Sequence, residues 1–243
     1  MQELNTFQEV DWLTLNPMKA QSKEQLFHGI ILSFESYCKI LHPIFIDDSI
    51  KDQSITWNDV KKDSAVEQKS QIDKLLPQEN LIRGWSENAT KGHRILWKEL
   101  AVQCGIQFDA RITDESFTKT FPTRSWPRYL LGPQEGSIDI KTVQALIQNL
   151  SVFTVNKDCY FYYMPLTAAD CNQHLFKGKL NEIHHLFSDK CIGGAPTYWW
   201  GEDRAWCVNT SYDSTFTVVS GSRLLVDQVL NNACLECIQI TKV

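Results

Sequence analysis

Apolar side chains between residues 22 and 42 recur at the spacing of an amphipathic helix. Ser22 is suited to cap this helix, and Gln25 holds the position that completes a capping box. The predicted apolar face consists of Leu26, Phe27, Ile30, Ile31, Phe34, Tyr37, Cys38 and Leu41. The first long element is therefore predicted to be a helix that ends at His42-Pro43, because proline cannot continue it.

A second helix is predicted from about residue 90 to residue 104. Gly105 is suited to stop this helix, because glycine readily adopts the left-handed conformation that ends many helices. Apolar and polar residues then alternate from 106 to 112, which is the period of a half-buried strand. Residues 1–125 are accordingly predicted to be a mainly helical region.

After this point the pattern changes to short strands, turns and short helices, so residues 126–243 are predicted to be an α+β region. The predicted elements are a helix capped by Asp139, a strand at 159–164, one or two short helices at 167–187, strands at 197–200, 205–210 and 215–219, a helix capped by Ser222 and a strand at 235–240. Hairpin connections make the sheet antiparallel, with the helices packed on it. The expected fold class is α+β, in two regions or as one continuous domain.

The 243 residues include 43% hydrophobic side chains, which is enough for a substantial core. The formal net charge is -5, so the chain has no overall attraction for nucleic acid or for anionic membranes. Its longest apolar stretch, around Ile30-Ile31-Leu32, is interrupted by charged residues and is too short to cross a bilayer. We therefore expect neither a nucleic-acid partner nor a membrane partner.

Eight cysteines are spread along the chain, an even number that would permit disulfides in a secreted protein. The first residues, MQELNTFQEVDW, lack the basic and apolar regions of an export signal. Free thiols in a reducing cytoplasm are therefore the favoured interpretation. The predicted location is the cytoplasm.

Four residues have a spacing that could suit zinc, namely Cys171, His174, His184 and Cys191. Zinc binds thiolates and imidazoles in a tetrahedron, and Cys171 and His174 would place two such ligands on one turn. The second pair lacks tight spacing, so core thiols and surface histidines are the favoured interpretation. No metal and no cofactor are predicted, and these four residues are the candidates if a metal does bind.

The chain contains none of the short motifs of phosphate loops, dinucleotide sites, serine nucleophile elbows or zinc proteases. A nucleophilic site would have to be assembled by folding. The alternative function is a small cytoplasmic hydrolase or transferase, for which zinc is the candidate metal. Its cleft would gather Cys171, His174, His184 and Asp203. A binding protein is favoured over this enzyme.

A cluster of charged residues, Glu202-Asp203-Arg204, lies at the predicted hairpin tip among aromatic residues. Charged residues at such a tip are commonly just solvated. Tryptophan, tyrosine and arginine, however, dominate the hot spots of protein interfaces. Arg204 could also pair with Asp213 and fix the hairpin. The predicted binding residues are Trp199, Trp200, Glu202, Asp203, Arg204, Trp206, Tyr212 and Asp213.

The segment WWGEDRAWCVNTSYDSTFTVVSGSRLLVDQVL, followed by LECIQI, resembles the closing segment of an uncharacterised bacterial family of unknown function. The resemblance covers mainly residues 197–240. Similar closing segments occur in immunity-type proteins, which neutralise a toxin by binding it. The resemblance implies a cytoplasmic bacterial protein with a toxin-like protein partner, and it supplies no catalytic residues.

Overall fold

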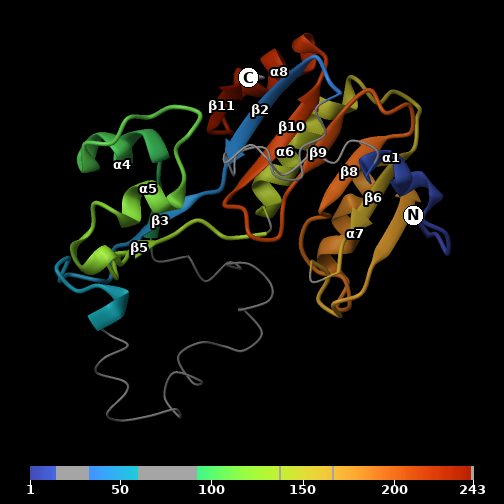
Figure 1. Cartoon of the computed structure of the whole chain (residues 1–243). Helices are drawn as coiled ribbons and strands as arrows, with labels where there is room; N and C mark the ends of the chain where they lie inside the picture. The colour runs from blue at the N-terminus through green and yellow to red at the C-terminus, as the bar shows by residue number, and fades with distance from the viewer. Residues whose placement is uncertain (15–32, 60–91, 137, 166, 242–243) are drawn as a thin grey trace. The chain divides into compact units, whose positions relative to one another are not determined.

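The computed structural model describes residues 1–14, 33–59, 92–136, 138–165 and 167–241 (Figure 1). The strands are β1 (Gln2–Glu3), β2 (Ser36–Leu41), β3 (Ile44–Asp47), β4 (Gly92–Ile95), β5 (Leu130–Leu131), β6 (Cys159–Tyr163), β7 (His174–Gly178), β8 (Tyr198–Gly201), β9 (Cys207–Asn209), β10 (Phe216–Gly221) and β11 (Cys237–Ile240). The helices are α1 (Asp11–Thr14), α4 (Trp97–Cys104), α5 (Asp114–Thr118), α6 (Ile140–Ser151), α7 (Ile183–Ser188) and α8 (Arg223–Leu230), with 3₁₀ turns at Gln8–Val10, Pro122–Arg124 and Leu180–Glu182. The chain divides into a larger unit, residues 1–42 with 135–243, and a smaller unit, residues 43–134.

The larger unit is built on an eight-stranded antiparallel sheet with the order β1-β7-β6-β8-β9-β10-β2-β11. Strand β2 comes early in the chain but lies between β10 and β11, with Cys38 opposite Val219 on one side and Gln239 on the other. All six residues of β2 are buried. A strand that is paired on both sides and covered on both faces is a central strand, so β2 joins the early and late parts of the chain.

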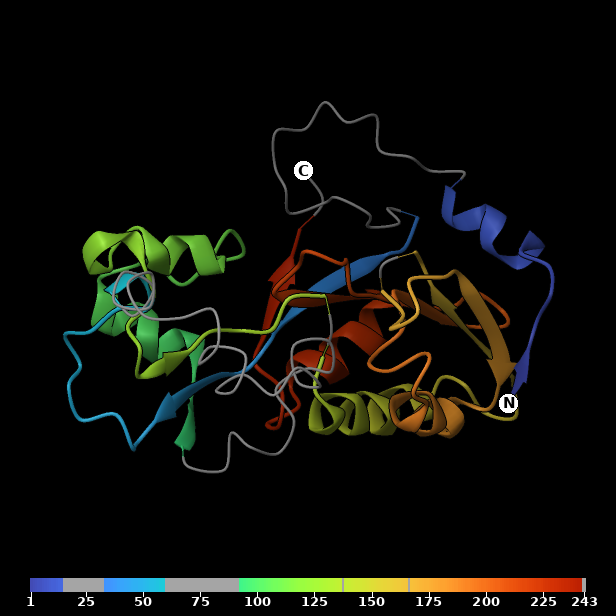
Figure 2. The same ribbon diagram turned by 90° about the horizontal axis from the view of Figure 1, so that it is seen from below.

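Helices α6, α7 and α8 lie on one face of this sheet, as the two perpendicular views show (Figure 2). Asp139 caps α6 by accepting hydrogen bonds from the backbone N–H groups of Lys141 and Thr142, and Ser222 caps α8 by accepting one from Leu225. The core between sheet and helices contains Cys38, Leu146, Phe161, Ile183, Trp199, Val208, Val219 and Val226, all of them buried. Burying each large side chain of this kind stabilises the fold by about 1.5–3 kcal/mol.

The smaller unit contains a three-stranded antiparallel sheet with the order β4-β3-β5, together with α4 and α5. Its core is aromatic: the ring of Phe117 lies 5.3 Å from that of Trp97 and 6.0 Å from that of Trp126. Gly105 follows α4 with a positive φ of 66°, and its N–H bonds back to the last turn. The predicted helix stop at this glycine is confirmed.

The prediction of a helical N-terminal half is wrong, because antiparallel sheet dominates the described residues and their helices are short. Of the helix predicted for 22–42, the final part forms strand β2, and residues 22–32 lie outside the described residues. Of the helix predicted for 90–104, residues 92–95 form β4, and the helix begins at Trp97. Strand β2 is buried on both faces, including Ser36 and Lys39, so its apolar residues do not alternate with exposed polar ones. Periodicity alone does not distinguish such a strand from part of a buried helix.

Two further predicted elements are also wrong. Residues 106–112 form turns and irregular structure where a strand was predicted. Residues 174–178, predicted to be helical, form β7, which pairs with β6 along its whole length. In contrast, α6, β6, the β8–β9 hairpin, β10, α8 and β11 confirm the predictions for those segments.

The three tryptophans of the β8–β9 hairpin are completely buried, so we expect them to stabilise the fold. Trp199→Ala should lower the free energy of unfolding by about 3–5 kcal/mol, because it removes a large core side chain. Tyr212→Ala is the matched control: this side chain is 59% exposed, and its removal should change stability by less than about 0.5 kcal/mol. Urea unfolding followed by circular dichroism measures both. Equal, small losses would contradict the packing described for Trp199.

Candidate functional site

The predicted hairpin tip is the turn between β8 and β9, and its backbone is held firmly. The N–H of Glu202 donates to the carbonyl of Asp158 at 2.9 Å, and the N–H of Arg204 donates to the carbonyl of Gly201 at 2.7 Å. Arg204 has a positive φ of 55°, which non-glycine residues adopt mainly in tight turns. A Cβ atom on Gly201 would lie only 3.0 Å from the carboxylate of Asp203, so a side chain fits poorly there. The turn therefore has a defined conformation.

Each charged side chain of the tip has an oppositely charged partner within the protein. The pairs are Glu202–Lys177 at 2.7 Å, Asp203–Lys157, and Arg204–Glu9 at 3.3 Å. Burial acts to raise the pKa of Asp203, but hydrogen bonds from Lys157 and from a backbone N–H outweigh it and lower that pKa below its ordinary value. The hydrogen bond to Glu202 raises the pKa of Lys177. These side chains are exposed, and they belong to an internal network of ion pairs.

The tryptophans beside the tip point into the protein. Trp199 and Trp206 pack edge to face, 6.0 Å apart, in the core beneath the helices. The indole N–H of Trp206 donates to the hydroxyl of Thr154 at 3.0 Å. Trp200 is buried on the opposite face of the sheet. None of these three predicted binding residues offers its ring to a partner in this conformation.

The last two predicted binding residues lie in the turn between β9 and β10, at the other end of β9 from the tip. Tyr212 is exposed, and the carboxylate of Asp213 accepts a hydrogen bond from the hydroxyl of Ser211 at 3.1 Å. The predicted pair between Arg204 and Asp213 does not form, because Arg204 pairs with Glu9. The structure therefore separates the predicted set into a charged tip, three core side chains and a distant turn.

Residues 1–14, here called the N-terminal strap, begin with the edge strand β1 and continue from Leu4 to Leu13 over the sheet face opposite the three helices (Figure 2). Strand β1 pairs with β7, and the N–H of Leu4 donates to the carbonyl of Leu175 at 2.8 Å. Strap side chains then pack on an aromatic area of the sheet. The strap contributes Leu4, Phe7, Val10, Trp12 and Leu13, and the sheet contributes Tyr160, Tyr162, Leu175, Tyr198, Trp200 and Cys207.

Arg204 connects the hairpin tip to the strap. Its guanidinium lies 5.4 Å from the ring centre of Trp12, a cation–π contact, and it also pairs with Glu9. Sequence reasoning identified Arg204 but missed both partners, because they lie about 190 residues earlier and no local pattern connects them. Through Arg204, the hairpin tip is therefore attached to the N-terminal strap.

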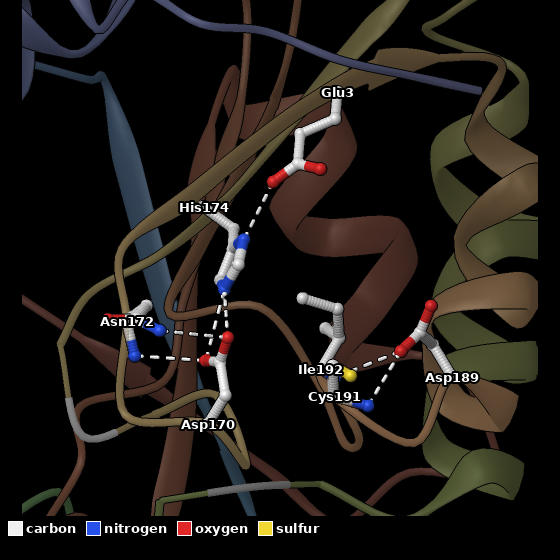
Figure 3. A network of polar contacts seen from close by, with 7 residues as sticks. All are labelled: Glu3, Asp170, Asn172, His174, Asp189, Cys191 and Ile192. Carbon is white, nitrogen blue, oxygen red and sulfur yellow. Dashed lines mark hydrogen bonds and ion pairs between the residues drawn. The ribbon is translucent and has the colours of Figure 1, made fainter.

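A second charged connection to the strap is centred on His174 (Figure 3). Its Nδ1 lies 2.7 Å from the carboxylate of Glu3, and its Nε2 lies 3.0 Å from both carboxylate oxygens of Asp170. Burial acts to lower the pKa of His174, but the two carboxylates outweigh it and raise that pKa. Hydrogen bonds from Asn172 and from His174 lower the pKa of Asp170 to about 2. Both ring nitrogens are thus engaged by carboxylates, which favours an imidazolium bridge over a free general base.

The residues considered for zinc or catalysis do not converge. Cys171 and Cys191 are exposed, and His184 lies on α7. His174 stands at the start of β7 opposite Tyr163, whereas Asp203 follows the Gly201 end of β8, at the opposite end of β6. Across the described ranges, no group of three or more His, Cys, Asp and Glu residues could hold a metal ion.

Comparisons with protein families, with curated proteins and with solved structures give no match to this chain. In the part of the chain that the structure describes, no helix is long and apolar enough to cross a membrane.

Stability should depend on pH through His174. A histidine with a raised pKa in the folded state stabilises the fold fully below its unfolded value of 6.5, and this contribution is lost as the pH rises through the folded pKa. Asp170 contributes above 3.8 and loses its effect as the pH falls toward about 2. The difference in melting temperature between the wild type and His174→Gln should therefore be largest between pH 3.8, the ordinary pKa of Asp170, and pH 6.5, that of His174, and it should shrink at alkaline pH. A difference that does not vary with pH would contradict this bridge.

Proposed function

We propose that this protein acts by binding another protein, and that its partner is a toxin that it neutralises. The recognition surface includes the predicted tip residues Glu202 and Asp203. It also includes two exposed valines that follow the end of α6 at Ser151, namely Val152 and Val155. We call these four residues the valine surface.

The exposed valines are the observation that carries this proposal. Val152 and Val155 are 61% and 64% exposed. The hydrogen bond between Thr154 and Trp206 holds this segment against the base of the hairpin, and Lys157, two residues after Val155, pairs with Asp203. The two valines thus lie beside a charged network, an arrangement that suits an apolar interface centre with a polar rim.

The toxin as partner follows from the resemblance of residues 197–240 to immunity-type closing segments. The proposed location is the reducing cytoplasm, and it is supported by the eight cysteines, all of which are free thiols. Burial raises the pKa of Cys159 to about 12, which keeps that thiol protonated and unreactive. The buried thiols of Cys38, Cys159 and Cys207 serve as apolar side chains of the fold.

The double variant Val152→Lys/Val155→Lys tests the valine surface. If a neighbouring gene encodes a growth-arresting toxin, co-expression with wild-type protein should restore growth, and the double variant should fail to do so. We expect the dissociation constant for that toxin to rise at least about thirtyfold, because charge replaces apolar contact at an interface centre. The melting temperature should stay nearly unchanged, since both side chains are exposed.

Val102→Lys is the matched control, because Val102 is 76% exposed and lies on α4 of the smaller unit. This variant should protect as well as the wild type. Full protection by the double valine variant would exclude the valine surface. Neighbouring genes that encode no growth-arresting protein would count against the toxin as partner.

A further inference from the structure

The sheet face beneath the strap is a continuous aromatic area. The rings of Tyr160 and Trp200 stack at 5.5 Å, and those of Tyr162 and Tyr198 stack at 6.4 Å. Trp12 of the strap meets Trp200 edge to face at 5.5 Å. Aromatic surfaces of this kind are typical of binding hot spots, and here the resident occupant is a segment of the same chain.

The strap leaves polar groups of this area unsatisfied. The indole nitrogens of Trp12 and Trp200 are both buried, and within the described residues neither has a hydrogen-bond partner. Trp200 is completely buried, so water cannot readily replace the missing acceptor. A buried donor without an acceptor disfavours the docked state. An occupant with an acceptor at this point would fit the site better than the strap does.

The strap is attached most strongly at its first residue: Met1, whose side chain is only 7% exposed, pairs through its terminal ammonium group with Glu182 at 2.6 Å. The other connections of the strap are individually modest. Its strand β1 contains only two residues, followed by the single hydrogen bond of Leu4 to Leu175. The ion pairs of Glu3 and Glu9 are open to solvent, with those carboxylate side chains 54% and 44% exposed. Exposed ion pairs contribute little to stability and weaken as salt increases.

We propose that the surface beneath the strap is a peptide-binding site, and that residues 1–14 are its resident ligand. The partner is an acidic, extended segment of another protein that displaces the strap. This site goes beyond the valine surface, since it lies on the sheet face that residues 1–14 cover, and it does not depend on the toxin proposal.

The strap itself defines the chemistry of such a segment. Its backbone adds a strand to β7, as β1 does. One carboxylate pairs with His174 in place of Glu3, and a second pairs with Arg204 in place of Glu9. Near Trp200 it carries an apolar or aromatic group together with a hydrogen-bond acceptor, which the strap lacks.

The test measures whether the full-length protein accepts such a peptide from solution. The probe is a peptide with the sequence of residues 1–14, labelled with a fluorophore at its carboxyl end. In the variant Glu9→Lys/Trp12→Ala the resident strap is weakened and the sheet face is unchanged. We expect this variant to bind the probe at least about tenfold more tightly than the wild type, because the intramolecular competitor is weakened. Fluorescence anisotropy measures the affinity.

Two controls make the result specific. Arg204→Ala, added to the strap variant, should weaken binding by about tenfold, because it removes the attraction for Glu9 and Trp12 of the probe without restoring a charge pair to the resident strap. A probe that carries Glu9→Lys and Trp12→Ala should not bind. Binding by the strap variant no tighter than by the wild type, or equal binding of both probes, would overturn the proposal.

A second measurement applies if the strap variant fails to fold. In the wild type, hydrogen exchange followed by mass spectrometry should show residues 2–13 exchanging at least about a hundredfold faster than β6, because an exchangeable ligand opens without global unfolding. Equal protection of the strap and β6 would show that the strap is a fixed part of the core and would overturn the proposal.

Discussion

The larger unit depends on the pairing of β2 with strands that lie far away in the sequence. Residues 36–41 pair with 216–221 on one side and with 237–240 on the other. Bringing such distant segments together costs loop-closure entropy, although that cost grows only slowly with loop length. The cost is offset by two ladders of backbone hydrogen bonds and by six buried residues. Without β2, strands β10 and β11 would have no common neighbour.

This long-range pairing explains which parts of the fold could be predicted from the sequence. The segments around α6, β6, the β8–β9 hairpin and α8 carry local signals, such as the cap residues Asp139 and Ser222, and these predictions are confirmed. Strand β2 carries no such local signal, since its apolar residues, interrupted by Lys39, also fit a helix, and its strand conformation is set by neighbours about 180 residues later. Residues 174–178 likewise become a strand because β6 provides a partner for them.

The candidate site was predictable to a similar extent. The sequence identifies the charges of Glu202, Asp203 and Arg204 and their place at a hairpin tip, and the hairpin is confirmed. It does not identify their partners, because Lys177 and Glu9 meet the tip only through the sheet order. The aromatic residues were misleading for a simple reason: in a sheet covered on both faces, alternating side chains are all buried, whichever way they point.

The connection between the two units has a consequence for the architecture of the chain. Residues 43–134 leave the larger unit after His42 and return to it at Glu135. At the point of exit the N–H of His42 donates to the carbonyl of Thr215, and at the point of return the N–H of Gly136 donates to the carbonyl of Ser214. Since Ser214 and Thr215 are adjacent in the chain, both ends of the excursion are held at one place. The smaller unit is thus an insertion at a single turn of the larger one, and the sheet is topologically complete without it.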